Sequence, residues 1–204
     1  MELLLVHLTD IHIRDAEDLD VLSTRTDSIG GAICNHITEP DETEIVFCVT
    51  GDLAFSGKNE QYTAVGLILD EIYSIVNKRC PKVGIHAVFV PGNHDCDFDA
   101  PEEEVREQLL ISPALDISKP LIMKACTAIQ KNFYAFGDEW NKKHGAMICN
   151  DDKILTVNEL NFDLYGVHLK FHCINTSWCS KKHEEKGKMK IATGKMSMTI
   201  DFLE

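Results

Sequence analysis

The sequence predicts an α/β fold whose central sheet is largely parallel, and two observations predict this class. Three short apolar runs, at residues 3–8, 45–50 and 83–90, each end in a polar tip, as strands buried on both faces do. Two stretches with the apolar spacing of amphipathic helices separate these runs, at residues 23–37 and 59–78. Strands that alternate with helices in this order favour parallel pairing.

The two helical stretches have predictable ends. In the first, apolar residues recur every four positions from Ile29 to Ile37, and Ser23 or Thr24 is expected to cap the helix. In the second, apolar side chains recur at three- and four-residue spacing until Pro81 ends the helix. Both helices are therefore expected to lay one apolar face on the sheet.

The chain changes character after the third predicted strand. Pro101 is well placed to open a helix, and residues 118–142 show helical spacing. Residues 153–157 and 162–176 return to a strand pattern. We therefore expect a helical insertion at about 97–150, between two parts of one sheet system.

Length and charge bound the class of protein. At 204 residues the chain can bury a core of its own, so one domain over residues 1–204 is expected. Lys and Arg number 20 against 33 Asp and Glu, which gives a formal charge of −13. Proteins that bind long nucleic-acid duplexes by general electrostatics usually carry a net positive charge. Nucleic acid stays open as a partner, but the charge does not favour it.

The cysteines and the shortness of the apolar runs point to a cytoplasmic protein. The eight cysteines include no C-x-x-C pair, which argues against a structural zinc knuckle. Cys48 and Cys173 lie inside apolar runs, where a free thiol behaves as a small hydrophobe, so a reducing compartment is expected. No run approaches the ~18 apolar residues of a membrane span, so no membrane partner is expected.

Side chains that can ligate metals follow each of the three predicted strands. In chain order they are Asp10 with His12, then Asp52, then Asn93, His94 and Asp95. Because ligands gather outside the carboxyl ends of parallel strands, we expect these groups to share one crevice. A single strand-end Asp is usually a turn or cap residue, but the ordered combination favours a metal site.

The residue types suit two divalent ions. Asp10 and His12 lie two positions apart, so in an extended segment they point the same way and can chelate one cation. Asp52 can bridge two cations through its two oxygens, and Asn93 offers a neutral carbonyl oxygen. Mixed imidazole and carboxylate ligation suits manganese, our first choice, and also Fe, Zn or Ni. Two metals about 3.5–4 Å apart commonly clamp both oxygens of an in-line displacement.

The ordered blocks TDIH, TGDLAFSG and PGNHDCD resemble the calcineurin-like metallophosphoesterases. That signature runs D-x-H, G-D, G-N-H-[DE], a later His and a final G-H-x-H. The resemblance covers residues 1–98 and resumes at 164–204. It implies a two-sheet β-sandwich flanked by helices. It also implies a dinuclear phosphoesterase, in which a metal-bound hydroxide attacks a phosphomonoester or phosphodiester.

The resemblance also implies a role for each residue. The metal ligands would be Asp10 and His12 for the first ion, Asp52 for both ions and Asn93 for the second. His94 would be catalytic, either protonating the leaving group or stabilising the transition state. Asp95 is the second catalytic candidate because it could orient His94, with a turn-stabilising carboxylate as an equal alternative.

The later blocks of that signature do not occur in the sequence. No G-H-x-H is present, and His168 and His172 lie on an apparent strand, where packed or paired residues are expected. We therefore expect a C-terminally incomplete domain whose remaining ligands belong to a longer chain, and little or no activity from the 204 residues alone. Two alternatives stay open: a degenerate, non-catalytic binding module of the same fold, and a nuclease that uses a patch such as Lys181 to Lys190.

Overall fold

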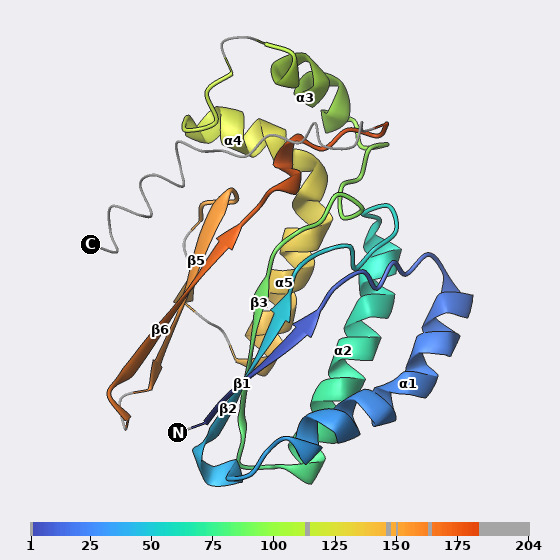
Figure 1. Ribbon diagram of the computed structural model, residues 1–204. Helices are drawn as coiled ribbons and strands as arrows, with labels where there is room; N and C mark the ends of the chain where they lie inside the picture. The colour runs from blue at the N-terminus through green and yellow to red at the C-terminus, as the bar shows by residue number, and fades with distance from the viewer. Residues whose placement is uncertain (1, 113–114, 146–147, 150, 163–164, 184–204) are drawn as a thin grey trace.

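Two three-stranded sheets face each other in the computed structural model, which describes residues 2–112, 115–145, 148–149, 151–162 and 165–183 (Figure 1). The first sheet is parallel and has the strand order β1-β2-β3. Its strands are β1 Glu2–Leu8, β2 Thr43–Val49 and β3 Gly84–Phe89. The predicted α/β class and the two-sheet architecture are confirmed.

The register of the first sheet brings the predicted site residues to one edge. Leu8 pairs with Val49, and Val49 pairs with Phe89, so the three strands end level with one another. The loops after the strands therefore leave the sheet side by side. Phe47 packs into the core under the helices, whereas Val46 faces the second sheet, as period-two alternation requires.

Helices cover the outer face of the first sheet. They are α1 Ala16–Asn35, α2 Asn59–Arg79 and α5 Lys131–His144. The expected cap at Ser23 or Thr24 is wrong, because both residues lie inside α1 and bond to carbonyls one turn back. Asp15 caps α1 instead, accepting from the backbone N–H groups of Glu17 and Asp18.

The segment after the third strand is mainly helical, as predicted: α5 lies along the first sheet, whereas the earlier helices of the segment lie beyond the carboxyl ends of β1 to β3 (Figure 1). Its other helices are α3 Glu102–Leu110, α4 Pro120–Cys126 and the 3-10 turn η2 Ala128–Gln130. The helical character expected over 118–142 is confirmed, but η2 separates α4 from α5. Ile129 and Gln130 are fully buried there, and Ile129 accepts a backbone hydrogen bond from Asp97, so tertiary contacts impose the break.

The second sheet is antiparallel, with strand order β4-β5-β6. Its strands are β4 Ile148–Cys149, β5 Leu155–Phe162 and β6 Val167–Ile174. The insertion expected at 97–150 therefore ends in a short strand rather than in a helix. Leu160 and Cys173 pack against Val46 and Val88 of the first sheet, which closes the sandwich.

Several expectations fall outside the described residues or stay untested. Most of the lysine-rich stretch 181–190 and the chain end at 184–204 lie outside the described ranges. The extent of the domain over 1–204 stays a prediction. Each cysteine whose side chain is described carries a free thiol. In the described part of the chain, no helix is long and apolar enough to cross a membrane.

Candidate metal centre

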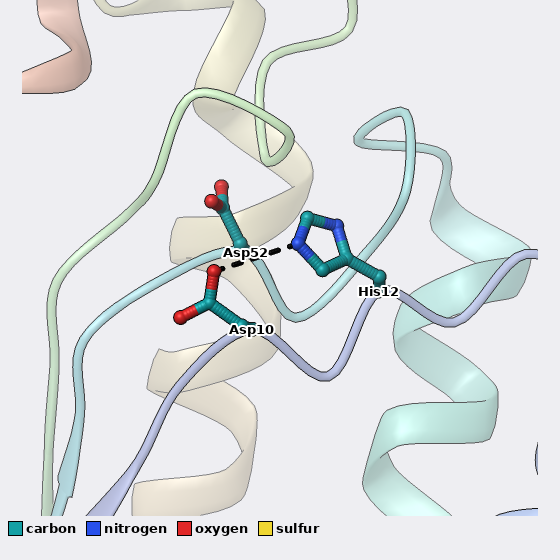
Figure 2. A group of neighbouring side chains, drawn as sticks. All are labelled: Asp10, His12 and Asp52. Carbon is teal, nitrogen blue, oxygen red and sulfur yellow. Dashed lines mark ion pairs between the residues drawn. The ribbon is translucent and has the colours of Figure 1, made fainter.

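Asp10, His12 and Asp52 come together at the carboxyl edge of the first sheet (Figure 2). Each offers one ligand atom, and these atoms all lie within 4.8 Å of one another. His12 Nε2 lies 3.6 Å from Asp10 Oδ1, the pair joined by the dashed line in Figure 2. One imidazole nitrogen and two carboxylates at this spacing can hold a divalent cation.

All three side chains project from left-handed backbone. The φ angles are +56° at Asp10, +53° at His12 and +54° at Asp52. The extended geometry expected around Asp10 and His12 is therefore wrong. A non-glycine residue in this region costs about 1–2 kcal/mol, so the neighbouring structure must hold it there.

Backbone hydrogen bonds between the two loops supply that restraint. Asp10 N–H donates to the Gly51 carbonyl at 3.2 Å, and His12 N–H donates to the Asp52 carbonyl at 2.9 Å. Further along, Ile13 N–H donates to Leu53 O at 3.0 Å. The loop after β1 therefore runs along the loop after β2, which places the three candidate ligands together.

Two glycines let the loops after β2 and β3 touch. Gly51 has a φ of +97°, and a Cβ there would lie 2.2 Å from the backbone nitrogen of Gly92. A Cβ on Gly92 would lie 2.1 Å from Oδ1 of Asp52. No side chain fits at either position, so the close approach of the loops requires glycine at both.

Asp95 lies beneath this contact and is fully buried. Its carboxylate accepts from the backbone N–H groups of Asp52, Ala54 and Gly92 at 2.7, 3.2 and 2.9 Å, and from the Tyr62 hydroxyl at 2.9 Å. Burial raises the pKa of Asp95 to about 6, although these hydrogen bonds act in the opposite direction. The contacts favour the turn-stabilising role over the catalytic one.

His94 is oriented by Phe55 and not by Asp95. Its Nδ1 lies 2.9 Å from the Phe55 carbonyl, so Nδ1 carries the proton and donates. The ring stands edge-on to His12, with ring centroids 4.5 Å apart, and lies 5.4 Å from the Phe55 ring. Nε2 is then the ring nitrogen left for proton exchange, and a catalytic role for His94 stays a prediction.

Asn93 is exposed on the same turn and lines a cavity of about 450 Å³ between the two sheets. The next residue, His94, donates its backbone N–H to Asp52 Oδ1 at 2.9 Å, which places the turn against the candidate ligands. Ligation of a second ion by Asn93 stays a prediction. His168 forms an ion pair with Glu159 and, like His172, does not belong to the ligand group.

Several supporting residues have no signal in the sequence that reveals their role. Tyr62 belongs to the apolar stripe of α2, so its spacing predicts only a core residue. The single clue to its bond with Asp95 is that a buried hydroxyl usually needs a hydrogen-bond partner. Ser177 and Gln130 are also buried beside the turn at 91–96, and nothing in their local sequence reveals it. Their contacts arise from segments far apart in the chain.

One comparison with known proteins agrees with the family that these residues suggest. A family model described as calcineurin-like phosphoesterase matches residues 3–193. The match spans all six residues that the sequence proposes for the site. The comparison with curated proteins gives no match.

Proposed function

Because the chain belongs to the calcineurin-like phosphoesterase family, we propose that it hydrolyses a phosphomonoester or phosphodiester with the help of two divalent cations. The observation that carries this proposal is the grouping of Asp10, His12 and Asp52, whose ligand atoms lie within 4.8 Å of one another. The free thiols of the described cysteines support a cytoplasmic location.

The donor set fits a transition metal. One imidazole with two carboxylates suits manganese, and also iron, zinc or nickel, better than calcium or magnesium. Asp52 is the proposed bridge, since its carboxylate keeps further lone pairs after accepting the His94 N–H. The exposed side chain of Asn93 would join it at the second ion, with further ligands from outside the described residues.

The chain's own residues position the reaction. Bound cations would lower the pKa of a water molecule and neutralise charge on the phosphoryl oxygens. His94 in its imidazolium form would donate the Nε2 proton to the leaving oxygen and become neutral, while Nδ1 keeps its own proton on the Phe55 carbonyl. The left-handed backbone at Asp10, His12 and Asp52 holds the ligand side chains in place before any substrate arrives.

The test is hydrolysis of an aryl phosphate and a bis-aryl phosphodiester by the full-length protein with Mn²⁺. Asp52→Asn and His94→Ala should each abolish turnover. Asp41→Asn is the matched control, because Asp41 forms an exposed ion pair with Lys82 on another part of the surface. Full activity in either site variant would contradict the proposal. If elemental analysis finds no metal in the protein without substitutions, the result would favour the non-catalytic binding module instead.

A further inference from the structure

The peptide unit between Pro91 and Gly92 is held from both sides. On one side, the Gly92 N–H donates to Asp95 Oδ2 at 2.9 Å. On the other side, the Ser177 hydroxyl lies 2.9 Å from the Pro91 carbonyl oxygen and 3.0 Å from Asn175 Oδ1, and it shares its one proton between these two acceptors. Ser177 follows β6 of the second sheet, 86 positions further along the chain. Asn93 comes directly after this peptide, so its backbone position depends on both contacts.

Ser177 is itself held by a buried polar network. Its exposed fraction is 2%, and those of Gln130 and Asn175 are 0% and 3%. Gln130 Nε2 donates to the Ser177 hydroxyl at 2.8 Å, and Asn175 Nδ2 donates to Gln130 Oε1 at 2.8 Å. The Ser177 N–H donates to Asn175 Oδ1 at 3.0 Å. Buried polar side chains that satisfy one another in this way are rigid.

The insertion anchors the same segment. Arg106 of α3 is fully buried and donates from one guanidinium nitrogen to the carbonyls of Trp178 and Ser180, at 2.8 and 2.7 Å. The short turn that carries Ser177 is therefore tied to α3, to η2 through Gln130 and to the second sheet through Asn175. Through its contact with the Pro91 carbonyl, the Ser177 hydroxyl restrains the loop after β3.

The loop after β3 has little freedom to adjust. The Cα of Gly92 lies so close to Asp52 that a Cβ would come within 2.1 Å of its Oδ1. A small rotation of the Pro91–Gly92 peptide would therefore move Asn93 relative to Asp52. Groups that orient metal ligands without touching the metal typically change metal affinity or activity by about 10–100-fold when removed.

We propose that Ser177 is a positioning residue for the second metal position, acting on Asn93 through the Pro91–Gly92 peptide. This inference rests on the proposed function, because it needs Asn93 to serve as a ligand. Ser177 touches neither the metal nor the substrate in this role. Ser177 holds the Pro91 carbonyl of the peptide, and Asp95 holds the Gly92 N–H of the same peptide.

The test is Mn²⁺ titration, by calorimetry, of the full-length protein and of Ser177→Ala, Ser177→Thr, Asn93→Ala and the double variant. Ser177→Ala should weaken binding at one position about 10-fold and leave the other within about twofold. Ser177→Thr keeps the hydroxyl and should recover part of the loss. In the Asn93→Ala background, Ser177→Ala should have no further effect, because both changes act on one ligand. An additive effect, or no effect, would overturn the inference.

Thr26→Ala is the matched control, since Thr26 is also a buried hydroxyl, bonded to a helix carbonyl in α1. It should leave Mn²⁺ affinity unchanged. If the unaltered protein binds no Mn²⁺, the proposed function fails, and amide hydrogen exchange then tests the Ser177 contact separately. Ser177→Ala should speed exchange at Gly92, and Thr26→Ala should not. Unchanged exchange at Gly92 in Ser177→Ala would show that the hydroxyl does not hold the peptide.

Discussion

The backbone N–H of Asp52 donates a 2.7 Å hydrogen bond to Oδ2 of Asp95, across 43 positions of sequence. The same oxygen accepts from Gly92, and Oδ1 accepts from Ala54 and Tyr62. One buried carboxylate thus joins the loop after β2, the loop after β3 and helix α2. The candidate bridging ligand and the turn that carries Asn93 and His94 are therefore held by one carboxylate buried beneath them.

Replacing Asp95 by Ala should destabilise the fold strongly. The change leaves three backbone N–H groups and the Tyr62 hydroxyl without their acceptor in a buried place. The expected loss in the free energy of unfolding, measured by urea denaturation, is about 3–5 kcal/mol. Asp99→Ala is the control: its carboxylate is exposed and pairs with Lys58 and Lys182, so its loss should cost far less stability than the loss of Asp95. Equal losses would contradict the role given to Asp95.

Replacing Gly92 by Ala should damage the candidate metal centre directly. The new Cβ would lie 2.1 Å from Asp52 Oδ1, so either the side chain of Asp52 or the loop must move. We expect Mn²⁺ affinity, measured by titration calorimetry, to fall at least tenfold, as when other groups around metal ligands are disturbed. Gly166→Ala is the comparison, because Gly166 has a φ of +61° but open space around it. It should cost about 1–2 kcal/mol of stability and leave Mn²⁺ affinity unchanged.

Replacing Arg106 by Met should loosen the helical insertion. The guanidinium bonds to both carboxylate oxygens of Glu103 and to the Cys126 carbonyl, in addition to Trp178 and Ser180. Its removal leaves Glu103 as a partly buried charge without its partner, and burial already raises the pKa of that carboxyl. We expect a loss of about 3–5 kcal/mol and faster proteolysis within α3 and α4. Arg25→Met, at an exposed position of α1, should change neither measurement.

Asp70 should make stability depend on pH in the acid range. Burial opposes its ionisation, but hydrogen bonds from Lys143 and His144 outweigh burial, so the pKa of Asp70 lies below its usual value. The unfolded chain therefore binds the proton more tightly. The stabilisation is complete above the unfolded pKa of about 3.9 and is lost as the pH falls through the folded pKa.

Asp70→Asn should accordingly lower the free energy of unfolding by about 0.5–1 kcal/mol at pH 7. The difference from the unaltered protein should disappear in the most acidic buffers of a pH series of urea denaturation curves. Glu71→Gln removes one charge from an exposed position of the same helix and should stay within about 0.5 kcal/mol at pH 7. A difference for Asp70→Asn that stays constant across the series would show that its ionisation has no part in the effect.

The parts of this protein that the sequence predicts correctly are those that depend on local patterns. Buried strands leave continuous apolar runs, and α2 leaves a repeat of apolar side chains, so β1, β2, β3 and α2 are found close to their observed bounds. The order of polar residues after the strands predicts the grouping of Asp10, His12 and Asp52, because parallel strands end at one edge.

Only the tertiary structure decides what holds that group together. The left-handed backbone at Asp10 and His12 is stabilised by carbonyls of another loop, and the acceptor of the Asp52 N–H belongs to Asp95. Ser177 reaches Pro91 only because the second sheet packs against the first. A hydrogen bond between distant segments leaves no periodicity in either of them. The sequence by itself therefore determines which side chains meet at the edge of the sheet, whereas the packing of distant segments decides how they are held there.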